Sequence, residues 1–274
     1  MHALTTRSIR AITAGTSESN SENIRRALTL GLPEFTPAFC AHDGNMVIVG
    51  SGPSLPRFVE EIRQEREKGR PICAIKGAGD FLIENGIEPD LFVSCEPRSR
   101  PLQKISEHTV YLLASRCPPD LFEQLKGKNV VLWHSFASKT DAQPPPSGKT
   151  LKWEDFDPSE ECEVWKGHFG VGGASTSGLR AFNLVYLMGF RKIILYGFDS
   201  CLAADRDTKR FSGEKVGTGA IVDVIVAGKR FWCNGALAQQ ATEFQKVIGG
   251  LVGLKVEARG DGLIAAILKA RAAR

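Results

Sequence analysis

Long apolar runs are missing from this chain of 274 residues. No stretch of about 18 apolar residues occurs, which argues against a membrane span, and the first residues lack the apolar core of a signal peptide. The seven cysteines stand singly, with no Cys-x-x-Cys pair. Their odd number and their scatter argue against a disulfide framework or a zinc site, and reduced thiols are typical of the cytoplasm. We therefore expect a cytoplasmic protein with no membrane partner.

A large surplus of charge of one sign is also missing. The chain has 35 basic and 31 acidic residues, for a formal net charge of +4. This surplus is too small to indicate nucleic-acid binding, but it is compatible with a small phosphate-bearing ligand. Hydrophobic residues make up 42% of the chain, enough for a sizeable core. We expect a small-molecule nucleotide as the partner, and the sequence gives no indication of oligomeric state.

What is present is an alternation of strand-like and helix-like segments. Such an alternation predicts an α/β fold with a Rossmann-like, mostly parallel sheet flanked by helices. In open sheets of this kind, ligands bind beyond the carboxyl ends of the strands. The expected strands of the sheet are residues 46–49, 71–75, 91–95, 110–114, 129–133, 191–196 and 253–256.

The alternation is interrupted in three places. Residues 1–44 predict an N-terminal arm with a short helix, ahead of a Rossmann-like domain at 45–274. Residues 135–168 contain a proline run, and a segment of this length predicts a lid or binding loop, or else a surface excursion. Residues 219–233 predict a small β-hairpin.

Two glycine-rich turns lead into predicted helices, one after the first strand and one near residue 175. Such turns present unpaired backbone N–H groups to an anion, although each could also be a tight turn without a ligand. Ser54 is placed to cap the first helix, and Leu55 stands where the dinucleotide fingerprint has its third glycine. We predict phosphate contacts from Gly50, Ser51, Gly52, Pro53, Ser54, Gly173, Ser175, Thr176, Ser177 and Gly178.

Charged side chains follow several of the predicted strands. Glu96 and Asp199 come directly after apolar strands, so we predict them as catalytic groups and Mg²⁺ ligands. Lys76 and Arg98 are predicted to neutralise phosphate charge, the alternative being ordinary surface solvation. His134 follows the fifth strand and is predicted as a general base or ligand contact, the alternative being a structural histidine.

These motifs resemble a known family in their order and spacing. Residues 47–55, 86–90, 93–97 and 172–200 are similar to the MptE-like 6-hydroxymethylpterin diphosphokinases, whose domain also occurs in motility accessory factors and phage-borne proteins. The first and last of these blocks also resemble a family of bacterial sialyltransferases. The resemblance covers roughly residues 46–260. It implies a Rossmann-like fold, and either transfer of a diphosphate from ATP with Mg²⁺ or binding of CMP-sialic acid.

The chain departs from both families at particular positions. Glu96 stands where the pterin-type family commonly has Asp, and Lys76 where Asn is common. The sialyltransferases have Asn at the position of Ser51 and a late histidine base, whereas no histidine follows His168 here. We therefore expect a nucleotide-dependent transferase, in first place a diphosphokinase acting on a hydroxymethyl acceptor. The alternatives are a glycosyltransferase using a CMP- or UDP-sugar, and a non-catalytic phage or bacterial assembly or binding module.

Overall fold

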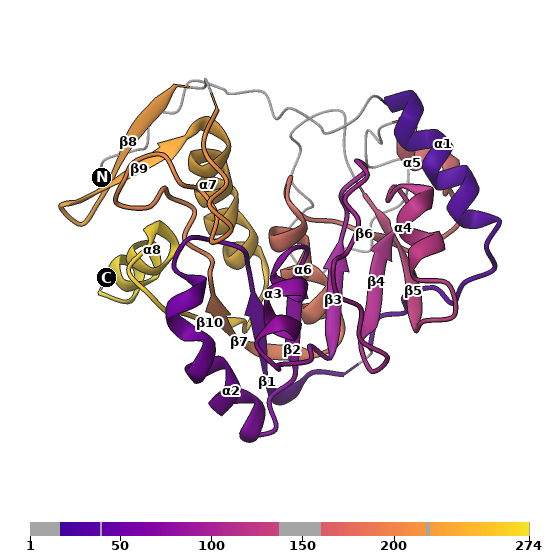
Figure 1. Cartoon of the computed structure of the whole chain (residues 1–274), viewed down its shortest axis with the longest axis horizontal. Helices are drawn as coiled ribbons and strands as arrows, with labels where there is room; N and C mark the ends of the chain where they lie inside the picture. The colour runs from indigo at the N-terminus through magenta and orange to yellow at the C-terminus, as the bar shows by residue number, and fades with distance from the viewer. Residues whose placement is uncertain (1–16, 39, 137–159, 218–219, 274) are drawn as a thin grey trace.

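A parallel sheet of eight strands organises the chain (Figure 1). The computed structural model describes residues 17–38, 40–136, 160–217 and 220–273, so most of the predicted lid and the start of the predicted arm lie outside the described residues. The order across the sheet is β10-β7-β1-β2-β3-β4-β5-β6. The strands are β1 (His42–Val49), β2 (Ile72–Ile75), β3 (Leu91–Ser94), β4 (Val110–Ala114), β5 (Val130–Ser135), β6 (Gly170–Val171), β7 (Phe190–Tyr196) and β10 (Lys255–Ala258).

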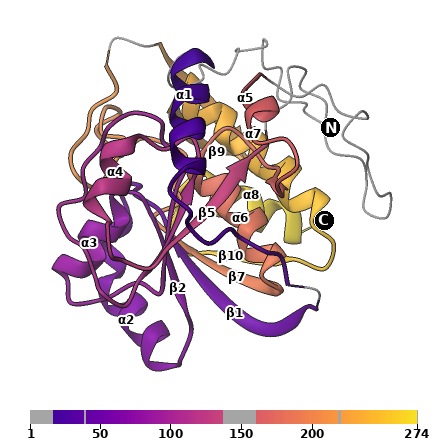
Figure 2. The same ribbon diagram turned by 90° about the vertical axis from the view of Figure 1, so that its right-hand side faces the viewer.

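Helices cover both faces of the sheet, which confirms the predicted α/β fold (Figure 2). One face carries η1 (Leu55–Phe58), α2 (Val59–Glu67), α3 (Ala78–Glu84) and α4 (Pro119–Gln124), and the other carries α6 (Ser177–Leu187), α7 (Gly235–Gly250) and α8 (Leu263–Ala272). A separate hairpin of β8 (Ile221–Val226) and β9 (Lys229–Asn234) packs on α7 and α8.

Burial on both faces explains why the strands are almost continuously apolar. In β1, Met46 and Ile48 belong to the core cluster that includes α6 and α7, whereas Val47 and Val49 belong to the cluster with α2 and α3. All four side chains are at most 1% exposed. Alternate residues of one strand thus anchor the two helical layers, and the sheet holds its loops at fixed positions.

The N-terminal part of the described chain packs on the far edge of the sheet. Helix α1 (Ser17–Leu28) lies beside α4 and α5 (Glu160–Val164), with Ile24 buried against Trp165. Glu34 then bridges Leu132 of β5, because the neighbouring backbone groups exchange hydrogen bonds of 2.7 and 2.8 Å with Leu132. The short helix predicted in the arm is therefore present, while the proposed domain boundary at residue 44 stays a prediction.

The chain order reverses beside β1. Strands β2 to β6 follow one another to one side of β1, and the chain then crosses back to place β7 on its other side. The carboxyl ends of β1 and β7 therefore flank the topological switch point, where ligands bind in open sheets of this type. The loops after these two strands touch through their backbones, since Gly50 and Gly52 donate to the Tyr196 and Gly197 carbonyls, each at 2.8 Å.

This close approach accounts for the two glycines of the first turn. A Cβ on Gly50 would lie 2.7 Å from the Gly197 carbonyl oxygen, and a Cβ on Gly52 would overlap the Asp199 carboxylate. No larger residue fits unless the two loops separate.

Among the described helices, none is long and apolar enough to cross a membrane.

The loop contact predicts the effect of Gly52→Ala. The new Cβ must displace Asp199 or the Gly197 carbonyl, so we expect the free energy of unfolding to fall by about 3 kcal/mol. Urea denaturation checks this value. The matched control is Gly217→Ala, because a Cβ at Gly217 meets nothing within 4 Å. Equal stabilities of the two variants would show that the loops are not in contact.

Candidate active site

Four charged or polar residues meet where β1, β2 and β3 end. Lys76 Nζ lies 2.8 Å from Glu96 Oε2, and Arg98 holds the same carboxylate through Nε at 2.6 Å and Nη2 at 3.0 Å. Ser51 Oγ lies 3.4 Å from the Ile75 carbonyl oxygen, next to Lys76. We call Ser51, Lys76, Gly77, Glu96 and Arg98 the edge site. Its members come from three successive strands of the sheet.

The Glu96 carboxylate is ionised and strongly held. Burial by itself would raise the pKa of Glu96, but the hydrogen bond from Arg98 and the charge of Lys76 outweigh it and lower the pKa to about 2. The Glu96 side chain is only 8% exposed, whereas that of Arg98 is 57% exposed. Since one carboxylate faces two cations, the edge site keeps one positive charge in excess.

The backbone at the edge site adds hydrogen-bond donors. Among the hydrogen bonds of the described residues, none uses the N–H group of Ser51 or Gly77 as donor. Lys76 has a φ of 51°, a left-handed conformation that is rare outside glycine. Strain of this kind costs of the order of 1–3 kcal/mol and clusters at functional sites. The turn after β2 is thus held in an uncommon shape that presents Lys76 beside the free donors.

A loop at residues 201–217 brings further basic side chains over the edge site. The Phe211 N–H donates to the Ser51 carbonyl at 3.2 Å, and the Phe211 ring packs on Phe81 with centroids 4.7 Å apart. Lys209 and Arg210 precede Phe211, and both pair with Glu214 at 2.8 Å. Glu214 in turn lies within the electrostatic range of Arg98 and Arg100. The basic side chains near the turn after β1 are thus Lys76, Arg98, Arg100, Lys209 and Arg210, and the carboxylates among and beside them are those of Glu96, Asp199 and Glu214.

Asp199 accepts a hydrogen bond from the Ser54 N–H, a group predicted from the sequence as a phosphate contact. The acceptor atom is Oδ2, at 2.9 Å. Ser54 stands at the N-cap of η1, as predicted, but its side chain makes no cap hydrogen bond. Asp199 is 5% exposed, and burial raises the pKa of its carboxyl group despite the opposing Ser54 bond. The carboxylate of Asp199 therefore fastens the loop after β7 to the turn after β1.

The second glycine-rich turn lies at the same edge of the sheet, and its Ser175 is bonded to another part of the protein. The Ser175 N–H and hydroxyl both donate to Glu243 of α7, at 3.1 and 2.6 Å. Thr176 caps α6 by accepting from the Leu179 N–H at 3.2 Å, as expected for a helix beginning here. Gly173 has a φ of 142°, and a Cβ there would lie 2.7 Å from the Asn183 amide.

Helix α6 is linked to the edge site and to the loop after β7. Ser177 Oγ accepts from the N–H of Cys95, the residue before Glu96, at 3.1 Å. Gln240 bridges Thr176, at 3.3 Å, and Ser200, at 3.0 Å. A Cβ on Gly178 would sit 3.1 Å from the Phe198 ring. The structure thus brings the start of α6 and both switch-point loops into one network, while the ligand contacts of these residues stay predictions.

His134 lies elsewhere. It is inside β5, three strands from β2, and its side chain is 1% exposed. Nδ1 lies 3.1 Å from Ser115 Oγ, and the ring stacks on Trp165 with centroids 5.4 Å apart. Burial lowers the pKa of His134, with Glu34 opposing, so the imidazole is neutral near pH 7. His134 is therefore remote from the edge site, and its predicted catalytic role has no support from contacts there.

Sequence reasoning missed the basic side chains that do not directly follow a strand. Lys209 and Arg210 lie in a loop whose fold over Ser51 depends on one backbone hydrogen bond and one ring contact. Gln240 is on a helix 64 residues from its partner Thr176. The adjacent pair Lys209-Arg210, shortly after Asp199, was the one available signal.

Two comparisons with known proteins matched the chain. A family model described as 6-hydroxymethylpterin diphosphokinase MptE-like matches residues 19–205, more than half of the chain. No curated protein matches the sequence. A solved structure, "Structure of MAf glycosyltransferase from Magnetospirillum magneticum AMB-1", matches with a TM-score of 0.62 and 15% identity. The match covers 95% of this chain and 42% of that chain, so the likeness shows the fold, and this chain spans less than half of its neighbour.

The charge balance at the edge site predicts how stability depends on pH. The pKa of Glu96 is lowered from 4.5 to about 2 on folding, so its contribution is present above pH 4.5 and is lost as the pH falls toward 2. After allowance for solvent around Arg98, the contribution is about 2 kcal/mol. We expect Glu96→Gln to be less stable than wild type by this amount at pH 7, with a difference that shrinks below pH 4.5. Urea unfolding at several pH values measures it.

The control for this prediction is Glu257→Gln. Glu257 pairs with Arg259 at 3.4 Å but is 68% exposed, so its loss should change stability by less than about 0.5 kcal/mol at every pH. A difference between wild type and Glu96→Gln that stayed constant from pH 7 to pH 3 would contradict the proposed ionisation of Glu96.

Proposed function

The chain belongs to the MptE-like family, and on that basis we propose that it is a nucleotide-dependent transferase whose phosphate-binding centre is the edge site. The observation that carries the proposal is the meeting of Lys76 and Arg98 with the unpaired N–H groups of Ser51 and Gly77. Cationic side chains and backbone donors together form the usual recognition set for phosphate oxygens.

The position of the edge site supports this proposal. The site lies at the carboxyl ends of the strands, beside the switch point between β1 and β7. The loop that holds Lys209 and Arg210 extends the positive charge beyond a single phosphate group. A nucleoside di- or triphosphate has the negative charge and the length to contact both groups of basic side chains.

The reaction we place first is transfer of a diphosphate from ATP to a hydroxymethyl acceptor. In this reaction the acceptor oxygen bonds to the β-phosphorus, the bond from that phosphorus to the oxygen of AMP breaks, and the acceptor proton passes to solvent or a base. Such transfers depend on positioning and on stabilising the negative charge of the phosphoryl oxygens. Lys76 and Arg98 would stabilise that charge, and the donors of Ser51 and Gly77 would orient the chain of phosphates.

Magnesium enters the proposal only as an ion brought by the nucleotide. Glu96 accepts from Lys76 and Arg98, and Asp199 accepts from Ser54, so the two predicted ligands are committed to protein donors. As arranged here, they do not fit a dedicated Mg²⁺ site, which requires carboxylate oxygens free to bind the ion. No step of the proposed reaction therefore depends on a metal ion held by the protein.

A glycosyltransferase is the second candidate, and one observation favours it. The edge site offers basic groups and backbone donors but no uncommitted carboxylate, which suits a nucleotide sugar bound through its phosphates without a metal. The solved structure with the same fold is titled a glycosyltransferase, which is consistent with this candidate. Release of AMP from ATP supports the first candidate, whereas release of CMP or UDP from a nucleotide sugar supports the second.

Calorimetric titration of the full chain tests the phosphate site. We expect ATP, or a CMP- or UDP-sugar, to bind with a measurable heat, and Lys76→Met to weaken the binding about tenfold or more, because one charge-assisted contact is lost. Arg98 still neutralises Glu96 in this variant. Titrations with and without Mg²⁺ show whether the nucleotide brings the ion.

The matched control is Lys246→Met. Lys246 is exposed on α7 and lies in none of the ion pairs of the described residues, so the control should bind nucleotide as the wild type does. No heat with any of the nucleotides would favour a non-catalytic assembly or binding module. Equal affinities for wild type and Lys76→Met would place the phosphates away from the edge site.

A further inference from the structure

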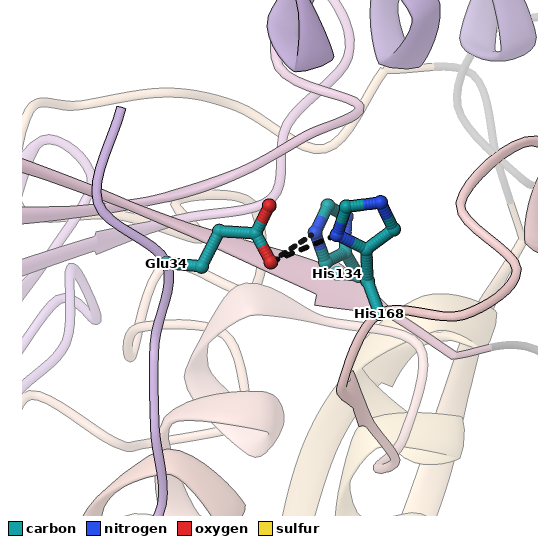
Figure 3. Close-up of side chains that lie close together, drawn as sticks. All are labelled: Glu34, His134 and His168. Carbon is teal, nitrogen blue, oxygen red and sulfur yellow. Dashed lines mark hydrogen bonds and ion pairs between the residues drawn. The ribbon is translucent and has the colours of Figure 1, made fainter. Parts of the chain in front are cut away.

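A second group of polar side chains lies near β5 and β6, the last two strands on one side of the sheet. Glu34, His134 and His168 each direct one ligand atom to a common point, and these atoms all lie within 4.8 Å of one another (Figure 3). Glu34 Oε2 is 2.9 Å from His168 Nδ1 and 3.5 Å from His134 Nε2. His134 is three strands from β2, which at about 4.8 Å per strand is roughly 14 Å from the strand that leads to Lys76.

The two distances from the Glu34 carboxylate are close to those around a tetrahedral metal ion. Zinc binds imidazole nitrogen and carboxylate oxygen at about 2.0–2.1 Å, which sets neighbouring ligand atoms about 3.3 Å apart. The Glu34–His134 separation is already close to this value, and the Glu34–His168 pair must open by a few tenths of an ångström. In Figure 3 both imidazole rings face the same carboxylate oxygen.

His134 supplies an independent observation that points to a ligand. Its Nε2 is buried and has no hydrogen-bond partner among the described residues. Nδ1 lies 3.1 Å from Ser115 Oγ. If Nδ1 carries the proton and donates to Ser115, the lone pair of Nε2 points toward Glu34 and His168. A second partner that fixes the tautomer in this way is the usual arrangement around a metal-bound histidine.

Glu34 Oε2 lies 3.5 Å from His134 Nε2, and this contact is not a hydrogen bond. A buried nitrogen without a hydrogen bond costs about 1–3 kcal/mol, so its position calls for an explanation. Stacking on Trp165 and the bond to Ser115 fix the ring of His134, so it has no freedom to turn toward another partner. A bound cation would satisfy Nε2 without any rearrangement of the core.

The three ligands come from separate segments whose backbones are anchored. Glu34 is held by its bridge to Leu132, and His134 pairs with Gly170 of β6. The His168 N–H donates to the Trp165 carbonyl at 3.1 Å. The side chains of Glu34 and His168 are each 37% exposed, so an ion can enter from solvent. Three protein ligands leave a fourth position open to water or another molecule.

We propose that Glu34, His134 and His168 form a binding site for Zn²⁺ or a similar divalent transition metal. Two imidazoles and one carboxylate select zinc-like ions over Mg²⁺ and Ca²⁺, which prefer sets of oxygen ligands. The scattered cysteines argued against zinc, but the ligands proposed here are histidines and a glutamate up to 134 residues apart. The ion would join the segment before β1 to β5 and to the loop before β6. This proposal is independent of the function proposed for the edge site.

The test uses the full chain, dialysed against a chelator and kept reduced. Isothermal titration with ZnCl₂ should give one equivalent bound with a micromolar or lower dissociation constant, and MgCl₂ should give no comparable binding. Zn²⁺ should also raise the melting temperature, because an ion that binds the folded state stabilises it. Co²⁺ should give the visible absorption of a tetrahedral complex without the near-ultraviolet band of thiolate ligands, which excludes binding by the cysteines.

Two variants keep the proposal falsifiable. His168→Ala and Glu34→Gln alter partly exposed side chains, and each should weaken Zn²⁺ binding by more than about 100-fold while the circular dichroism spectrum is unchanged. The control, His108→Ala, removes an exposed histidine and should bind as the wild type does. The proposal is overturned if the wild type binds no Zn²⁺ below about 100 μM. It is also overturned if His168→Ala and Glu34→Gln bind like the control.

Discussion

The buried carboxylate of Asp199 is the contact on which the arrangement of the switch-point loops depends. It accepts the N–H of Ser54 at 2.9 Å and lies so close to Gly52 that no Cβ fits between them. A buried charge of this kind is tolerated only when it is hydrogen-bonded, and removal of the partner would leave it uncompensated. Together with the backbone bonds from Gly50 and Gly52, this residue holds the loops after β1 and β7 side by side.

The same contact determines where an anionic ligand can bind. Asp199 accepts from the Ser54 N–H and Glu243 accepts from Ser175, so each glycine-rich turn has one N–H group that is already bonded to a carboxylate of the protein. The positive charge lies one strand further along, at Lys76, beside the unpaired N–H groups of Ser51 and Gly77. The protein therefore separates two tasks that a phosphate-binding turn often combines, holding the loops together and receiving the ligand.

Much of the fold could be predicted from the sequence, because both faces of a parallel sheet are buried and its strands are continuously apolar. The strand at 110–114 and the hairpin around residue 227 were predicted close to their observed bounds. The two-residue strand β6 was missed, since a segment of that length has no periodicity to detect. The N-cap position of Ser54 was predicted correctly, but the bond from its N–H to Asp199 was not, because the two residues are 145 positions apart.

The edge site and the Glu34 group were only partly predictable, because contacts between residues far apart in the sequence leave no local pattern. Lys76, Glu96 and Arg98 were found because each follows a strand, and the geometric rule for parallel sheets brings strand ends together. The partners of Glu34 could not be found, because its contacts with His134 and His168 depend on how the N-terminal segment packs against β5. Sequence periodicity predicts which face of an element is buried, but not which polar residues meet across distant segments.

A structure of the full chain crystallised with a bound nucleotide tests the account most directly. The account predicts phosphate oxygens on the N–H groups of Ser51 and Gly77 and beside Lys76, with Asp199 still bonded to Ser54. Phosphates bound instead at the N–H groups of Ser54 or Ser175, with Asp199 or Glu243 displaced, would contradict it.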